Sequence, residues 1–393
     1  MNQPKETLGK YTLIRHLATG GMAEIWLSEQ VGPGGFSKQL VIKRILGHLA
    51  QDQQFASMLL DEARTVAMLT HPNIGQVYEL GEVDGSYFIA MEFIDGIDLA
   101  DMSRLALEQE REIPLGIAVK IVVDMLQGLE YAHNFHDRDG HFMGLVHRDV
   151  TPHNVLVSND GVVKLVDFGV AKAKANQSKT QTGAVKGKFA YMAPEQIESK
   201  DMDRRVDVFA AGVVLYELLT LEKPFGDDLF AVNAILTRPM PDPREVRADI
   251  PQSIVNIISL ALSKDPGERY QTARTMMSDL EEYMSASGTF VHQRDIATYV
   301  RSLQGMMAPR TGRVEVSAGP RALITEREQA LRVSPHAHTA SSPSIAPTSV
   351  LASAASPAAQ GPAPGPSPTL AAHPTPAEPF DYAPPRRRRT SAC

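Results

Sequence analysis

The chain has 393 residues, of which 43% are hydrophobic, with a formal net charge of −7 and one cysteine, Cys393. This apolar content is enough for a sizeable core, and the modest negative charge argues against extensive nucleic-acid binding. A lone cysteine excludes an internal disulfide and fits a reducing compartment. Residues 1–9 are polar, and no segment reaches the roughly 18 consecutive apolar residues of a membrane helix. We therefore expect a cytoplasmic protein with no membrane span.

The first part of the chain, up to about Asp95, is predicted to form short strands and one helix. Apolar residues in Phe55–Leu69 recur at helical spacing. Strand-like runs separated by turn residues predict a small sheet from Leu13–Leu17, Glu24–Ser28, Gln39–Ile45, Gln76–Leu80 and Tyr87–Phe93.

Helical patterns dominate from Leu99 to about Gln304. The clearest helices are predicted over Ile117–Asn134, Val206–Leu221, Gln252–Ser263 and Thr272–Met284, and Phe290–Leu303 is expected to pack on the same lobe as one more helix. A small β-rich lobe followed by a larger α-helical lobe places the chain in the α+β fold class.

Beyond about Met307 the composition changes to Pro, Ala and Ser, and the only aromatic residues are Phe380 and Tyr382. Such a segment cannot bury enough apolar surface to offset its ordering entropy, so a disordered C-terminal tail is predicted. The tail ends in the basic run Arg386–Arg389, which we interpret as a charged terminus. Contact with an anionic membrane, nucleic acid or a docking partner is the alternative.

Two features of the β-rich part suggest contact with phosphate groups. Small residues between the first two strands would let the backbone approach phosphates, although a Gly-Gly pair also fits an ordinary hairpin turn. Lys43 stands among apolar strand residues, where an unpaired ammonium is costly. Glu62 on the following helix is its expected partner, and a solvated surface lysine is the alternative.

Two further motifs carry acidic and amide groups. His147-Arg148-Asp149 is followed by Asn154, and Asp167 opens Asp-Phe-Gly at the end of another apolar run. Asp149 would serve as a base toward a hydroxyl, while Asn154 and Asp167 would bind magnesium. Each tripeptide arises by chance fairly often, but their joint occurrence in this order does not. The set matches what phosphoryl transfer requires.

With these motifs, the sequence resembles the eukaryotic-like (Hanks-type) protein kinases, and bacterial members most of all. Ala193-Pro194-Glu195, Asp207 and Arg269 match further family positions. The resemblance covers about Tyr11 to Met284. It implies a two-lobed kinase domain at 11–284, after an N-terminal extension at 1–10, with the N-lobe at about 11–95 and the C-lobe at about 96–284. A helical extension at 285–306 and the tail at 307–393 follow.

The resemblance implies a serine/threonine-protein kinase that uses ATP with magnesium or manganese and acts on protein substrates. A dimer would allow autophosphorylation in trans. The catalytic residues would be Asp149, Lys43, Glu62 and Lys188, and the metal ligands Asn154 and Asp167. Nucleotide binding would involve Leu17, Ala18, Gly20, Gly21, Ala23, Ile25, Lys43, Met91 at the back of the adenine pocket, the hinge residues Glu92 and Ile94, and Asp98 near the ribose.

The chain departs from the family pattern in two places. Ala18 and Ala23 replace glycines of the phosphate loop, which would make the loop less adaptable where positive φ is needed. Thr151 replaces the usual lysine of the catalytic loop, and Lys188 stands where threonine is usual. Our hypothesis is that the two are exchanged, so that Lys188 supplies the ammonium. The alternative is that both positions have drifted and Lys188 faces solvent. Pro152 favours Ser/Thr over Tyr as the acceptor.

Regulation is predicted to involve the activation segment, which lies between Gly169 and Ala193. Phosphate on Thr180 or Thr182 (or Ser178) would pair with Arg148 and order the segment, and a merely polar, mobile loop is the alternative. The insertion Asn134–Gly144 is interpreted as a solvated loop rather than a metal site, since its His and Asp spacing matches no ligand pattern. A pseudokinase that acts as an ATP-binding scaffold and a small-molecule kinase are the alternative functions.

Overall fold

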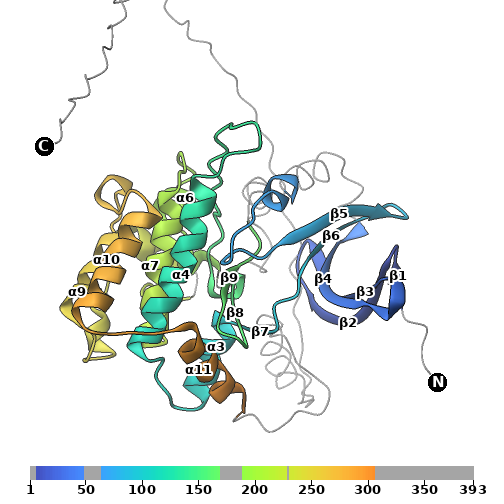
Figure 1. Ribbon diagram of the computed structural model, residues 1–393. Helices are drawn as coiled ribbons and strands as arrows, with labels where there is room; N and C mark the ends of the chain where they lie inside the picture. The colour runs from blue at the N-terminus through green and yellow to red at the C-terminus, as the bar shows by residue number, and fades with distance from the viewer. Residues whose placement is uncertain (1–5, 48–62, 169–187, 228–229, 306–393) are drawn as a thin grey trace, which may run out of the picture. The chain divides into compact units, whose positions relative to one another are not determined.

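The computed structural model describes residues 6–47, 63–168, 188–227 and 230–305 (Figure 1). Its N-terminal lobe is a six-stranded antiparallel sheet in the order β1-β2-β3-β4-β6-β5. The strands are β1 (Thr7–Leu8), β2 (Tyr11–Thr19), β3 (Ala23–Val31), β4 (Ser37–Ile45), β5 (Val77–Val83) and β6 (Ser86–Glu92). All five strands predicted for this lobe are therefore confirmed, each somewhat longer or shifted at its ends.

Alternation along the strands divides the residues of this sheet between two faces. Leu40 and Ile42 of β4 are buried with Leu13, Phe88 and Ala90 in the apolar core of the lobe. The intervening residues of β4 therefore point to the opposite face of the sheet. Of the helix predicted over Phe55–Leu69, residues 63–69 lie within the described part of the chain. Residues 63–67 are helical, and the helix ends two residues before the predicted end.

The C-terminal lobe is helical, with a three-stranded antiparallel sheet in the order β7-β8-β9. The strands are β7 (Gly96–Asp98), β8 (Val155–Ser158) and β9 (Val163–Leu165). The helices are α3 (Leu99–Glu108), α4 (Leu115–His133), α6 (Pro194–Ile197), α7 (Arg205–Thr220), α8 (Phe230–Thr237), α9 (Gln252–Ala261), α10 (Ala273–Ala286) and α11 (Gln293–Gly305). Short 3-10 turns cover Pro33–Gly35, Pro152–Asn154, Lys188–Tyr191, Pro243–Glu245 and Pro266–Glu268. The predicted helices are confirmed within two or three residues at each end.

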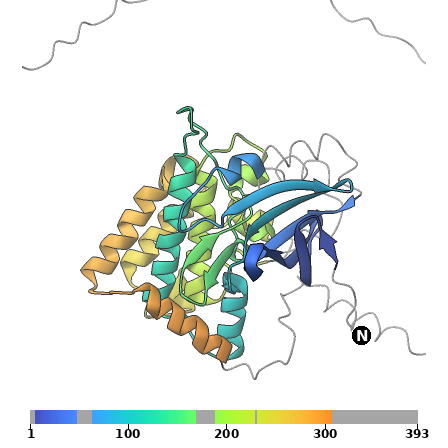
Figure 2. The ribbon, with the colours of Figure 1, turned by 45° about the vertical axis from the view of Figure 1, so that its right-hand side comes forward.

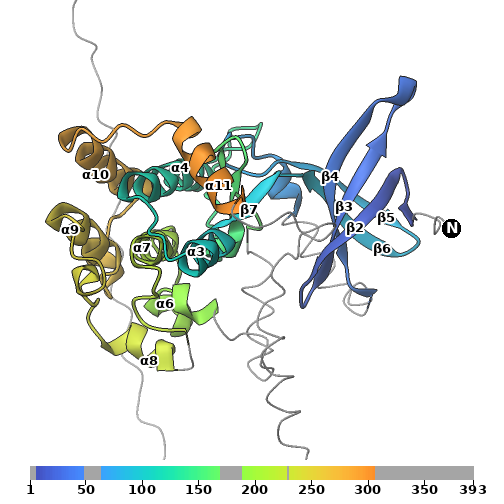
Figure 3. The same cartoon turned by 90° about the horizontal axis from the view of Figure 1, so that it is seen from below.

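Helix α7 forms the centre of this lobe. Every residue from Val206 to Thr220 is buried, and the helix packs against α3, α4, α9 and α10 (Figure 3). Gly212 permits the close approach of α9, because a Cβ there would come within 2.8 Å of the Ala261 Cβ. Helices α4 and α10 pack side by side on one flank (Figure 2, teal and light orange). Among the described residues, no helix is long and apolar enough to cross a membrane.

Helix α11 packs against α3 and β8 (Figures 1 and 3). Two of its side chains donate to backbone carbonyls: Gln293 Nε2 donates to Asp160 O at 2.9 Å, and Arg301 donates to Asn159 O at 3.0 Å. Both acceptors lie in the turn between β8 and β9. On its apolar face α11 buries Ile296, Ala297, Tyr299, Val300 and Leu303. The helix therefore belongs to the core of the lobe.

We expect Leu303→Ala to lower the free energy of unfolding by about 2–4 kcal/mol, because Leu303 is fully buried and its truncation leaves a cavity. Thr298→Ala, on the exposed side of α11, is the matched control and should change stability by less than about 0.5 kcal/mol. Chemical denaturation measures both. Equal stability of the two variants would show that α11 does not contribute to the folded core.

Candidate active site

Lys43 and Asp167 form an ion pair between the two lobes. Lys43 lies on the face of β4 opposite the buried Leu40 and Ile42. Its Nζ is 2.7 Å from Oδ1 of Asp167, which follows β9. The side chains are only 18% and 28% exposed, so the pair is screened less than a surface pair. A predicted phosphate-binding residue and a predicted metal ligand therefore lie together.

The turn at Asp167 is strained and held by packing. Asp167 has φ of 58°, in the left-handed region that non-glycine residues rarely adopt. The next side chain, Phe168, is buried with Leu69 and Ile74, and its ring centroid is 4.4 Å from that of His147. Burial of Phe168 offsets the strain and stabilises the turn that directs Asp167 toward Lys43.

Asp207, in the first turn of α7, fixes the predicted catalytic loop. Its carboxylate is buried and accepts hydrogen bonds from the backbone N–H groups of His147 and Arg148, each at 2.8 Å. A third bond comes from Nε2 of His133, at 2.7 Å. A buried carboxylate needs such partners to offset its lost hydration. The backbone just before Asp149 is therefore joined to the central helix of the lobe.

Asn154 orients the predicted base. Its Nδ2 donates to the backbone oxygen of Asp149 at 2.7 Å and to Oδ2 of the same residue at 2.9 Å. The amide nitrogen is thereby used within the loop, and the amide oxygen is the atom that Asn154 offers to a cation. Oxygen ligands of this kind suit magnesium.

The β8–β9 hairpin brings the two predicted metal ligands to the same end. Asn154 precedes β8 and Asp167 follows β9, and these ends of the two strands pair. Val166 N–H donates to Asn154 O at 2.9 Å, while Val166 O accepts from His147 Nε2 at 3.1 Å. The three segments that hold the motif residues are therefore connected by hydrogen bonds to the backbone of Val166.

The predicted phosphate loop is the β2–β3 hairpin. Gly20 N–H donates to Ala23 O at 2.8 Å, and Ala18 pairs with Ile25. Leu17 lies on β2 and Gly21 in the turn. Neither Ala18 nor Ala23 has positive φ. Both alanines lie in strands and adopt ordinary backbone in this hairpin. The lower adaptability expected of the loop stays a prediction.

The predicted hinge leaves β6 at Met91 and Glu92 and continues through the buried Ile94. The Glu92 carboxylate accepts from Lys164 Nζ at 2.9 Å and from Gln76 N–H at 3.1 Å. It therefore joins β6, β9 and the start of β5. Lys164 was not among the predicted site residues, although a lysine within an apolar strand is the same pattern that indicated Lys43.

Asp98, predicted near a ribose, caps helix α3. One carboxylate oxygen accepts from Asp101 N–H at 2.7 Å, and the other lies 3.2 Å from Nδ1 of His153. An Asp at this position stabilises the helix by satisfying a free N–H group. The capping bond fixes the side chain at the edge of the hinge.

Glu195 and Arg269 form a buried ion pair that holds α6. The guanidinium donates to the two carboxylate oxygens at 2.6 and 2.8 Å, and such bidentate pairs are strong and directional. Nearby, Tyr191 donates to Glu217 at 2.5 Å, and burial raises the pKa of both groups. The C-terminal end of the activation segment is therefore fixed to the lobe.

Several predicted residues are not placed. Glu62 lies outside the described residues, as do the predicted phosphorylation sites Ser178, Thr180 and Thr182. The backbone of Lys188 begins a short 3-10 turn, but its side chain is outside the described part. Thr151 is buried. The Lys43–Glu62 pair and the exchange of Thr151 with Lys188 remain predictions.

The insertion before the catalytic loop is an exposed hydrogen-bonded turn. Asp137, Asp139 and His141 offer ligand atoms within 4.8 Å of one another. Asp137 Oδ1 accepts from the N–H groups of Asp139 and His141, both at 2.9 Å. His133, from the same stretch of sequence, is instead buried against Asp207. This arrangement agrees with the predicted solvated loop.

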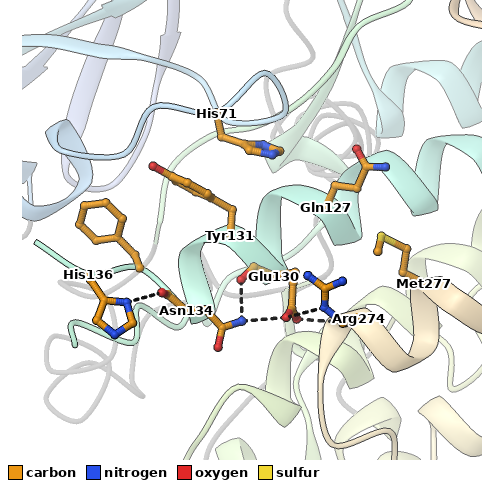
Figure 4. Close-up of a pocket in the computed structure, with 9 residues that line it drawn as sticks. His71, Gln127, Glu130, Tyr131, Asn134, His136, Arg274 and Met277 are labelled. Atoms are coloured by element: carbon orange, nitrogen blue, oxygen red, sulfur yellow. Dashed lines mark hydrogen bonds and ion pairs between the residues drawn. The ribbon is translucent and has the colours of Figure 1, made fainter. Parts of the chain in front are cut away.

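A hollow of about 610 Å³ lies between α4 and α10 (Figure 4). None of the predicted site residues lines it. Its central carboxylate, Glu130, accepts from Asn134 Nδ2 at 2.7 Å and from the backbone N–H of Arg274 at 3.0 Å. His71 stacks on Tyr131 at 4.9 Å. Because these groups pair with one another, we interpret the hollow as a structural gap.

Lys264, beside the Glu195–Arg269 pair, should make stability depend on pH. Burial, with Arg269 second, lowers its pKa from 10.5 to about 8. Between these values the unfolded chain binds a proton that the folded protein does not, so this lysine makes stability rise with pH. Below pH 8 Lys264 is charged in both states, and the full cost of burying its ammonium lowers the stability of the folded protein. We expect Lys264→Met to raise the melting temperature at pH 7, with the gain shrinking toward pH 10.

Thermal unfolding from pH 7 to 10 checks this expectation, and the exposed Lys200→Met is the control. Other titrating groups are common to all three proteins, so the difference isolates Lys264. A gain that stays constant over this pH range would contradict the assignment.

The protein is similar to bacterial protein kinases over most of its described length. The family model "Protein kinase domain" matches residues 11–280. The chain is 44% identical over 279 residues to "Tyrosine-protein kinase MasK" of Myxococcus xanthus, covering 70% of this chain and 43% of the relative. It is 32% identical over 284 residues to "Serine/threonine-protein kinase PrkC" of Bacillus subtilis, covering 72% and 42%. The chain thus spans less than half the length of these relatives.

Among solved structures, the crystal structure of the Mycobacterium tuberculosis PknI kinase domain is similar. The TM-score is 0.55 at 26% identity, covering 72% of this chain and 99% of that chain. Together with the family match, this likeness confirms the fold expected from the sequence, a β-rich N-lobe followed by a helical C-lobe.

Proposed function

Because the chain belongs to the protein kinase domain family, we propose that it is an ATP-dependent protein kinase that phosphorylates serine and threonine hydroxyls. The observation that carries the proposal is the grouping of Asp149 with Asn154, beside the Asp167–Lys43 ion pair. Phosphoryl transfer needs bound phosphates, a metal and a directed hydroxyl, with little covalent chemistry from the protein. These four side chains match those needs.

Each residue has a role in this proposal. Asp149 would accept the proton of the attacking hydroxyl, and Asn154 keeps its carboxylate in one orientation. Lys43 would contact the nucleotide phosphates. The backbone of residues 92–94 would bind adenine, with Met91 behind it. The β2–β3 hairpin would cover the phosphates.

The donor set fits a magnesium or manganese ion. The Asn154 amide oxygen and the Asp167 carboxylate are hard oxygen ligands, and the amide nitrogen already donates to Asp149. These two side chains would hold the metal, which neutralises charge on the transferred phosphoryl group. Lys43 would balance the remaining charge of Asp167 and of the phosphates.

The acceptor residue is the finer part of the proposal, because the relatives differ in their names. One is named a tyrosine kinase, while PrkC and the PknB proteins of Mycolicibacterium smegmatis and Mycobacterium tuberculosis are named serine/threonine kinases. Pro152 in the catalytic loop supports serine and threonine, and we propose these acceptors. The proposal also includes protein substrates, a cytoplasmic location, a dimer for autophosphorylation in trans, and a kinase domain at 11–284.

Asp149→Asn should lower phosphate transfer at least about 100-fold, because the hydroxyl loses its base. The assay uses the full chain, labelled ATP, magnesium and a generic protein substrate, with mass spectrometry to identify the labelled residue type. Asp139→Asn, the same chemical change on an exposed turn, is the control and should retain full activity. No transfer by the unmodified protein despite ATP binding would support a pseudokinase, and label on tyrosine would correct the acceptor.

The exchange of Thr151 and Lys188 predicts that Lys188→Ala lowers kcat about tenfold or more, because a charge near the transferred phosphate is lost. Adding Thr151→Lys to this variant should restore much of the loss. Lys186→Ala serves as the control in the same segment. Near-normal turnover of Lys188→Ala would show that the two positions have simply drifted.

A further inference from the structure

Gln196 joins helix α6 to the catalytic loop. It follows Glu195, and its side-chain amide makes two hydrogen bonds. Oε1 accepts from the backbone N–H of Ala193 at 2.9 Å, and Nε2 donates to the backbone oxygen of Arg148 at 3.1 Å. One amide thus connects the segment before α6 to the residue that immediately precedes Asp149.

The backbone of Arg148 needs such support. Its φ is 63°, a left-handed conformation that is costly for a residue with a Cβ and that persists only where surrounding contacts enforce it. Its N–H donates to Asp207 Oδ1 at 2.8 Å, and its carbonyl accepts from Gln196. The backbone N–H of the strained residue is therefore bonded to α7, and its carbonyl is bonded to α6.

The bond to the carbonyl bears directly on Asp149. The oxygen of Arg148 and the N–H of Asp149 belong to one planar peptide unit. Fixing that oxygen therefore fixes the plane from which the Asp149 side chain departs. Asn154 holds the carboxylate at its far end, so the two amides restrain the proposed base from both sides.

Helix α6 is itself fixed, which makes it a suitable support. Glu195 is held by the buried guanidinium of Arg269 at 2.6 and 2.8 Å. A short 3-10 turn, residues 188–191, forms the C-terminal end of the activation segment and ends just before α6. A displacement of that segment would therefore reach Arg148 through Gln196.

We propose that Gln196 is a positioning residue, which sets the peptide before Asp149 and makes the orientation of the base depend on the C-terminal end of the activation segment. This inference rests on the proposed kinase function. Gln196 does not touch the reacting atoms and acts through Arg148.

Gln196→Glu isolates the bond to Arg148, because it keeps the acceptor for Ala193 N–H and loses the donor. Gln196→Met removes both. Glu198→Gln, a carboxyl–amide exchange at the exposed end of α6, is the matched control. We expect kcat to fall about tenfold or more in both Gln196 variants, with the KM for ATP within about twofold of the unmodified protein. The control should stay within twofold in both constants.

Hydrogen–deuterium exchange tests the link without relying on turnover. In the Gln196 variants, exchange should become faster in residues 146–151 and stay unchanged in α7. Unchanged exchange there, or a kcat within twofold of normal, would overturn the proposal. So would a loss of activity accompanied by a lower melting temperature and faster exchange throughout the domain, since that pattern indicates only a structural role. If the unmodified protein transfers no phosphate, the proposed function fails, while the exchange data still decide the role of Gln196.

Discussion

The buried carboxylate of Asp207 is the interaction on which the arrangement of the site depends. It lies at the start of α7, the helix around which the C-lobe packs, and it accepts three hydrogen bonds at 2.7–2.8 Å. Two of them come from consecutive backbone N–H groups of the catalytic loop. Charge-assisted bonds of this kind are strong in a low-dielectric interior. They stabilise the left-handed backbone of Arg148. They therefore determine the position and direction of the Asp149 side chain.

Much of the fold followed from local pattern. Strand-like runs separated by turn residues located the strands of the N-lobe. Apolar residues at helical spacing located the long helices, because one face of each helix must be buried. The ends of the strands and helices were less well predicted, since they depend on capping residues. Asp98, for example, is the last residue of β7, and its side chain caps the N-terminus of α3. Helical structure was predicted from Leu99 onward, but α3 was not predicted as a separate helix with its own bounds.

The site was only partly accessible from sequence. The order of the motifs identified Asp149, Asn154 and Asp167 as candidate site residues. In the structure Asn154 contacts Asp149, and the paired ends of β8 and β9 bring Asn154 and Asp167 to the same end of the hairpin. The partners that hold them are distant in sequence, and nothing in a single chain specifies such pairs. Lys164 with Glu92, 72 residues apart, and Gln196 with Arg148, 48 residues apart, depend on the packed tertiary structure. Ala18 and Ala23 do not adopt positive φ in the hairpin, and the lower adaptability expected of a loop with alanine at these positions stays a prediction.

Helix α11 shows that the packed C-lobe extends beyond the family match. The match stops at residue 280, whereas apolar side chains up to Leu303 are buried in the lobe and the N-terminal end of α11 lies against the β8–β9 turn. The opposite end of that hairpin carries Asn154 and Asp167. Anyone who transplants this catalytic unit into a fusion protein, or trims it for crystallisation, should place the junction after Gly305. A junction chosen from family boundaries alone would remove the support beneath the hairpin while leaving every motif residue in the sequence.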